Sequence, residues 1–219
     1  MKINANEIQR RYFDCTEDSI REIRSEGGEE SFKIKGTPVV YNRETVLYES
    51  EYVRISEIIE SGAARNALLR AEQVLLWNHD SSKPMAARKN NTLTVREDAS
   101  GVHIEADAGG TVWGREGFEA IRAGLVDKMS FGFYLKEDGY TEERTAENGK
   151  RVYKRIIKAF DRIVDFSPVT YPAFEDTSVS ARDVEGVMKD FAEEKQKRNA
   201  AKTKAGDLYK EFSEKVISA

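Results

Sequence analysis

Short apolar runs separated by turn-forming residues constrain the fold of this 219-residue chain more than any other feature. Runs of four to eight residues in which apolar and polar side chains alternate are typical of β-strands. The segments with this character are 32–41, 45–48, 52–55, 74–77, 92–96, 102–106, 126–135, 151–157 and 163–171. Many short strands with few helices predict an α+β, mostly β fold, with an antiparallel β-barrel core and a few flanking helices.

Two segments within this region have helical periodicity instead. Residues 63–71 place small and apolar side chains on one side, which predicts a short helix. Residues 113–123 repeat apolar side chains at helical spacing, and Gly124 follows where a helix of this kind ends. The polar residues 137–149 are expected to form a loop.

The two ends of the chain differ in character from its middle. Residues 1–30 are highly charged and end in a glycine- and glutamate-rich stretch, so we expect a flexible N-terminal segment. Residues 31–182 contain the strand-like runs and form the expected compact domain. Residues 183–219 repeat apolar side chains at helical spacing, which predicts an amphipathic helical tail, with a polar linker at 198–206.

Composition narrows the classes of function. The chain has 35 basic and 39 acidic residues, a net charge of -4, so a phosphate-binding surface and a nucleic-acid partner are not expected. No apolar run is long enough to cross a membrane, so no membrane association is expected either. The single cysteine fits a reducing compartment. Two histidines and one cysteine are too few for a usual zinc site, and we expect neither metal nor cofactor.

One candidate for chemistry is His79, which follows the apolar run 74–77 where it breaks into a polar turn. Histidine is the side chain whose usual pKa lies closest to neutrality, as a general base requires. A second candidate is Ser130 in the run 128–133. On a strand, Ser130 and Gly132 share one face, and Gly132 leaves room for a substrate backbone. A serine hydroxyl needs an adjacent base to act as a nucleophile.

Acidic side chains in the last strand could orient such a histidine. Asp161, Ile163 and Asp165 are expected on one face of that strand. A carboxylate beside a histidine fixes its tautomer and stabilises the imidazolium that forms during proton transfer.

In this order, the stretches resemble those of the prohead (capsid-maturation) serine proteases of tailed phages, which are similar in fold and chemistry to the herpesvirus assemblins. The resemblance extends from about residue 32 to residue 181. It rests on GTPVVYN at 36–42, SGA at 61–63, LWNHD at 76–80, IRAG at 121–124, MSFGF at 129–133 and DFSPVTYPAF at 165–174.

The resemblance implies roles for individual residues. His79 corresponds to the base and Ser130 to the nucleophile. The third member is Asp165, where the family usually has a glutamate, with Asp161 as a local alternative. His103 is a further alternative, because the assemblins use a second histidine, although theirs follows the nucleophile in sequence.

Arg88 corresponds to the arginine of a Gly-Arg pair in the family, although Ala87 replaces the glycine here. This makes Arg88 a candidate for placing substrate or a water near the oxyanion. A surface arginine paired with a carboxylate is the competing interpretation.

The implied function is that of a serine endopeptidase that cleaves the scaffolding region of a phage major capsid protein, and itself, during procapsid maturation. Its place of action would be the host cytoplasm, inside the assembling procapsid. The segments 1–30 and 183–219 are candidate sites of self-cleavage, and the helical tail is a candidate for capsid targeting or for a homo-oligomer contact. The alternative is a non-catalytic capsid assembly or scaffolding protein.

Overall fold

The computed structural model describes residues 7–13, 20–22 and 31–170, together with four isolated residues in the C-terminal segment. Those four are Lys189, Ala192, Gln196 and Thr203, and each is helical and exposed. The three ranges belong to one compact unit, and the four later residues belong to a second one. The rest of the tail at 183–219 lies outside the described residues, so its amphipathic character stays a prediction.

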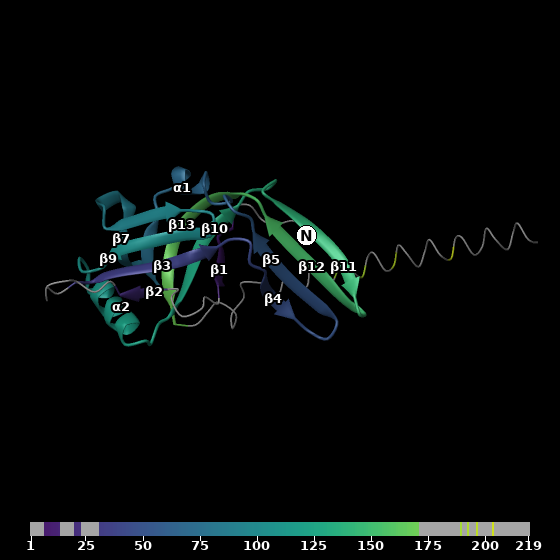
Figure 1. Cartoon of the computed structure of the whole chain (residues 1–219), viewed down its shortest axis with the longest axis horizontal. Coiled ribbons are helices and arrows are strands. Elements are labelled where there is room, and N and C mark those ends of the chain that lie inside the picture. The colour runs from purple at the N-terminus through teal and green to yellow at the C-terminus, as the bar shows by residue number, and fades with distance from the viewer. Residues whose placement is uncertain are drawn as a thin grey trace, which may run out of the picture. The chain divides into compact units, whose positions relative to one another are not determined.

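In the described part of the chain the strands form three sheets (Figure 1). The β10 sheet has five strands in the order β1 (Gln9–Phe13), β10 (Lys128–Leu135), β13 (Phe160–Val169), β6 (Val74–Trp77) and β7 (Asp80–Ala87). The β9 sheet has the order β2 (Ile20–Glu22), β3 (Lys33–Val40), β9 (Gly101–Asp107) and β8 (Leu93–Glu97). The β5 sheet has the order β11 (Tyr140–Glu147), β12 (Lys150–Ile157), β5 (Val53–Ile59) and β4 (Thr45–Glu49).

The predicted mostly β character is confirmed. The described residues also form two α-helices, α1 (Ala67–Arg70) and α2 (Val112–Arg122), and a single 3-10 turn, η1 (Arg88–Asn90). None of the described helices is long and apolar enough to cross a membrane.

The expectation of a purely antiparallel arrangement is wrong. Strand β13 pairs with β6 in parallel, and β12 pairs with β5 in parallel, so both sheets are mixed. Parallel partners need long connections, and in both pairs one strand comes from the first half of the chain and the other from residues 150–169. The strand orders are open, and no closed barrel is found among the described residues 7–13, 20–22 and 31–170.

Three further expectations are corrected. Strand β11 lies in the segment predicted to be a polar loop, and all of its residues pair with β12. Strands β1 and β2 lie within the segment 1–30 that we expected to be flexible. Helix α1 covers only part of the predicted helix at 63–71, since turns precede it.

The interior is built largely from the apolar faces of the β10 and β9 sheets. Met129, Phe131 and Phe133 alternate along β10 and are buried, as the alternation predicted. The Phe131 and Phe133 rings stack with their centroids 4.9 Å apart, and the Phe160 ring meets Phe133 edge-on at 4.8 Å. Aromatic pairs of this kind add about 0.5–1.5 kcal/mol beyond their area burial. The apolar face therefore fixes β10, and with it the opposite face of the same strand.

Helix α2 packs against the hairpin of β6 and β7. Thr111 caps its first turn by accepting a hydrogen bond from the Gly114 N–H, at 2.9 Å. A Cβ added at Gly117 would lie 2.6 Å from Met85 and 3.1 Å from the Trp77 ring, so the helix lies close to the end of β6. This packing supports the turn that follows Trp77.

Candidate active site

The centre of the site is the pairing of β10 with β13. In their antiparallel register Ser130 lies opposite Ser167 and Gly132 lies opposite Asp165. Because side chains alternate along a strand, these four residues share the face of the sheet that is turned away from the phenylalanine core. Two short polar segments, far apart in sequence, are thereby brought onto one face.

A β-bulge in β13 decides which acidic residue joins this face. Phe133 pairs with Ile163, whereas the neighbouring Gly132 pairs with Asp165, so Val164 is the extra residue. Ile163 is fully buried in the core. The expectation that Asp161, Ile163 and Asp165 share one face is therefore wrong, because the bulge reverses the alternation between Ile163 and Asp165.

His79 reaches the site from a tight turn between β6 and β7. Trp77 pairs with Asp80, which leaves a two-residue turn of Asn78 and His79 with φ values of 50° and 58°. Two successive positive φ angles are the signature of a type I′ hairpin turn, which suits the twist of the flanking strands. The Asn78 side chain accepts a hydrogen bond from the Thr170 N–H at 3.1 Å, and this ties the turn to the end of β13.

The three residues implied as base, nucleophile and orienting acid lie in hydrogen-bonding contact. The distance from His79 Nδ1 to Asp165 Oδ1 is 2.5 Å, and that from His79 Nε2 to Ser130 Oγ is 2.6 Å. A carboxylate only accepts hydrogen bonds, so Nδ1 carries a proton, and Nε2 of the neutral ring can accept the proton of the serine. The aspartate reaches the imidazole although it is one carbon shorter than the family's usual glutamate.

Ser167 is a fourth member of this cluster that sequence reasoning missed. Its Oγ accepts a hydrogen bond from the His79 backbone N–H at 3.1 Å and donates one to Asp165 Oδ1 at 3.0 Å. Ser167 is fully buried. It holds the histidine turn and the carboxylate in one geometry. The available signal was its place two residues after Asp165, on the same face of the strand.

Gly132 serves a different purpose from the one expected. A Cβ at this position would lie 2.0 Å from Asp165 Oδ2, well inside contact distance. Gly132 therefore leaves room for the carboxylate that bonds to His79. The expectation that it leaves room for a substrate backbone is corrected accordingly.

The local alternative Asp161 lies outside the cluster. Its two carboxylate oxygens each accept a hydrogen bond, from Arg70 and from Arg162, both at 3.1 Å. The side chain is partly exposed, and it belongs to ion pairs on the surface.

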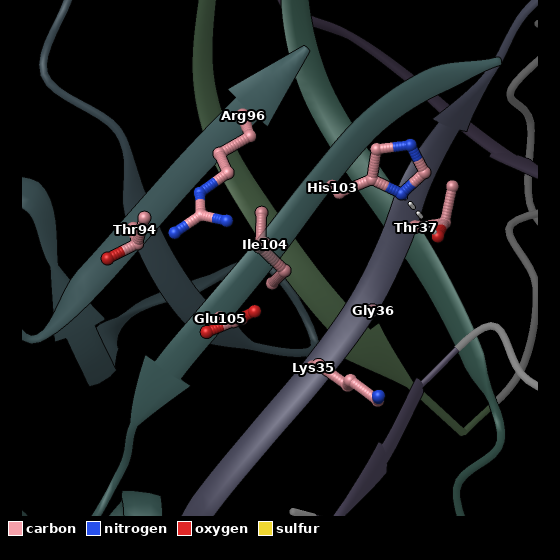
Figure 2. Close-up of a pocket in the computed structure, with 8 residues that line it drawn as sticks. All are labelled: Lys35, Gly36, Thr37, Thr94, Arg96, His103, Ile104 and Glu105. Carbon is pink, nitrogen blue, oxygen red and sulfur yellow. Dashed lines mark hydrogen bonds between the residues drawn. The ribbon is translucent and has the colours of Figure 1, made fainter. Parts of the chain in front are cut away.

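His103 also lies elsewhere, on β9 in a different sheet. Its ring nitrogens contact Thr37 Oγ1 at 3.1 Å and Ser100 Oγ and Asp98 Oδ2, also at 3.1 Å each. It lines a hollow of about 340 Å³ on the β9 sheet, whose labelled residues come from β3, β8 and β9 (Figure 2). Neither His79 nor Ser130 lines that hollow.

Arg88 lies near the start of β6, whereas His79 follows its end. Arg88 Nη1 donates hydrogen bonds to Leu68 O at 2.8 Å and to Gln73 Oε1 at 2.6 Å. Gln73 is fully buried. Four residues of strand, about 13 Å at 3.3 Å per residue, separate the two ends of β6. These contacts make Arg88 a support for the chain around α1 and β6. They give no support to its expected place near an oxyanion.

Strand β1 contributes an unexpected contact to Ser130. The Ser130 Oγ lies 3.0 Å from the backbone carbonyl oxygen of Arg11, and Ser130 has no exposed surface. No sequence pattern indicated that the N-terminal segment reaches the site. Within the described residues, no group of three or more His, Cys, Asp or Glu side chains is positioned to hold a metal ion.

The sequence matches the family model of the caudovirus prohead serine proteases over residues 19–190. The chain belongs to this family. The matched residues include His79, Ser130 and Asp165. The resemblance stated from sequence is thereby confirmed, as is the role of a prohead protease in capsid maturation.

This prohead protease was also compared with solved structures and with curated proteins. A solved structure of the bacteriophage T4 capsid assembly protease is similar at 14% sequence identity and a TM-score of 0.42. The match covers 76% of this chain and 100% of the T4 chain. No curated protein matches the sequence.

Proposed function

We propose that this prohead protease hydrolyses peptide bonds with a catalytic triad of Ser130, His79 and Asp165. The observation that carries the proposal is the chain of two short hydrogen bonds, 2.5 Å and 2.6 Å long, through the imidazole of His79. Such a chain lets a histidine accept the serine proton while a buried carboxylate stabilises the resulting imidazolium.

The reaction proceeds through an acyl-enzyme. Ser130 Oγ attacks the carbonyl carbon of the scissile peptide, and its proton passes to His79 Nε2. His79 then gives this proton to the leaving amine as the carbon–nitrogen bond breaks. A water, deprotonated by His79, attacks the ester and releases the new carboxyl end together with free Ser130. Asp165 and Ser167 keep the imidazole oriented throughout.

The substrate that fits a prohead protease is the scaffolding region of the phage's major capsid protein. The enzyme acts on it inside the assembling procapsid in the host cell. We also propose self-cleavage in the segments 1–30 and 183–219, because proteolytic nicking concentrates near chain termini.

The test is co-expression with the capsid protein of the same phage, followed by mass spectrometry of both chains. Wild-type protease is expected to shorten the capsid protein and itself, and the fragment ends then give the cleavage sites. Ser130→Ala and His79→Ala are expected to leave both chains intact. His103→Ala is the matched control, since it removes the other histidine of the chain, and it is expected to cleave as the wild type does.

Intact chains with the wild type, or fragments of the same size with Ser130→Ala, would contradict the proposal. In the first case the chain acts as a non-catalytic assembly protein. In the second case a different protease makes the fragments.

A further inference from the structure

The nucleophile strand β10 is covered on its outer edge by the N-terminal strand. All five residues of β1 pair with β10 in antiparallel register, from Gln9 opposite Phe133 to Phe13 opposite Met129. The other edge of β10 pairs with β13. Both backbone edges beside Ser130 are therefore occupied.

The peptide of β1 also occupies the position next to the nucleophile. Ser130 lies opposite Tyr12, and its Oγ is 3.0 Å from the carbonyl oxygen of Arg11. The exposed fraction of Ser130 is 0%. A substrate carbonyl cannot approach Ser130 Oγ while the Arg11 carbonyl lies there.

The side chain of Arg11 anchors β1 in this place. Arg11 Nε lies 2.9 Å from Glu57 Oε1 of β5, and the exposed fraction of each side chain is 3%. Arg155 of β12 approaches the other oxygen of Glu57 at 3.3 Å. A buried charge must keep its partner, because an uncompensated charge in the interior is strongly unfavourable. The ion pair thus links β1 to a different sheet from the one it extends.

We propose that β1 is an internal inhibitor that occupies the edge of β10 on which an extended substrate peptide pairs. This inference rests on the proposed function of Ser130. An extended peptide that adds to an exposed sheet edge gains main-chain hydrogen bonds along its length, a common mode of peptide recognition. Displacement of β1 frees this edge and uncovers the nucleophile in one step.

The extent of the family match supports a separable role for β1. The matched residues begin at 19, after β1 has ended at Phe13. The elements that carry Ser130, His79 and Asp165 all lie within the match. A five-residue edge strand pairs on one side only, so it opens more easily than the central strands of the sheet.

The experiment measures the rate at which a serine-directed phosphonate labels Ser130 in the full-length chain. Arg11→Ala removes the anchor and leaves Glu57 paired with Arg155. We expect labelling at least about tenfold faster than in the wild type, which corresponds to about 1.4 kcal/mol. Arg10→Ala is the matched control, because Arg10 is an exposed arginine on the same strand, and it should label at the wild-type rate.

Two additions separate opening from loss of structure. Arg11→Lys keeps the positive charge but lacks the forked guanidinium contact, so its rate should lie between those of the wild type and Arg11→Ala. A synthetic peptide of residues 7–13 should slow the labelling of Arg11→Ala again. An unfolded chain no longer holds His79 beside Ser130 and is not labelled faster.

Equal or slower labelling of both Arg11 variants, with Ser130 labelled in the wild type, overturns the inference and leaves the proposed function standing. No labelling of Ser130 in any variant overturns the proposed function and the inference together.

Discussion

Gly132 and Asp165 form a matched pair across two strands. The carboxylate occupies the volume that any larger residue at position 132 would need, since a Cβ there would lie 2.0 Å from Asp165 Oδ2. This close fit brings the acid to within 2.5 Å of His79. Ser167 donates a hydrogen bond to Asp165 Oδ1, the same oxygen that His79 contacts. The orientation of the His79 imidazole thus depends on the lack of a side chain at Gly132 and on the hydroxyl of Ser167.

Asp165→Asn should abolish most of the activity while leaving the chain folded. An amide can present its NH2 group to Nδ1 and favour the wrong tautomer, and we expect the rate of capsid-protein cleavage to fall by about 10³–10⁴-fold. Asp161→Asn, four residues earlier on the same strand, should cleave at the wild-type rate. Equal losses in both variants would contradict the assignment of Asp165.

Gly132→Ala should also lower activity, through geometry alone. The added methyl group pushes the Asp165 carboxylate away from His79, and a misplacement of about 1 Å in a catalytic group costs on the order of 10²-fold in rate. Gly110→Ala is the control, since a Cβ there meets nothing within 4 Å. Cleavage rates of the two purified variants make the comparison, and an unchanged rate for Gly132→Ala would count against the role given to Asp165.

At this scale the sequence predicted part of the site. His79 and Ser130 were identified from the short motifs LWNHD and MSFGF, and the two side chains are in contact in the structure. The choice between Asp161 and Asp165 depends on a bulge at Val164, which alternation alone does not reveal. The contacts of Arg11 depend on pairing between strands that are more than a hundred residues apart, and no local pattern encodes such a pairing.

At the scale of elements, Tyr41 joins three segments of the chain. It follows the end of β3, its hydroxyl donates to Glu97 of β8 at 2.5 Å, and it accepts from the Ala64 N–H before α1 at 3.2 Å. Burial, together with the hydrogen bond to Glu97, raises the pKa of the Tyr41 phenol well above its usual value. The folded protein therefore keeps this proton at a pH where an unfolded chain loses it.

This difference predicts a loss of stability in alkali. As pH rises above about 10, the usual pKa of tyrosine, unfolding releases the Tyr41 proton, and the free energy of unfolding falls by up to about 1.4 kcal/mol per pH unit. Tyr41→Phe should flatten this fall, at a cost of about 1–2 kcal/mol at neutral pH from the lost hydrogen bonds. The free energy of unfolding of the wild type and of Tyr41→Phe, measured by denaturant unfolding between pH 7 and pH 11, tests this prediction. A Tyr41→Phe variant with the same slope as the wild type would contradict the prediction.

The elements themselves were predictable where local chemistry decides them. The run at β6 and the helix α2 with its following Gly124 appear as expected, because periodicity and a positive-φ glycine at 71° are local signals. Strand β11 was missed because it is polar along its length, and only its pairing with β12 makes it a strand. The two parallel strand pairs could not be predicted, because the alternation of apolar and polar residues within a strand does not indicate which strand it pairs with.

At the scale of the described chain, the site is assembled from segments that are 51 and 86 residues apart. The phenylalanine core fixes β10 from one side, and the turn of Asn78 and His79 reaches the other side from β6. The N-terminal strand β1 then covers Ser130. We propose that this arrangement holds the triad of Ser130, His79 and Asp165 beneath a strand whose displacement exposes Ser130.

The proposed reaction depends on Ser130 as a nucleophile that His79 activates. The most direct test is labelling of the full-length chain with a serine-directed phosphonate, followed by mass spectrometry of the proteolytic peptides. We expect a covalent adduct on Ser130 and none in Ser130→Ala. Labelling should be at least about 10²-fold slower in His79→Ala and should proceed at the wild-type rate in His103→Ala. An adduct on another residue, or equal rates in the two histidine variants, would contradict it.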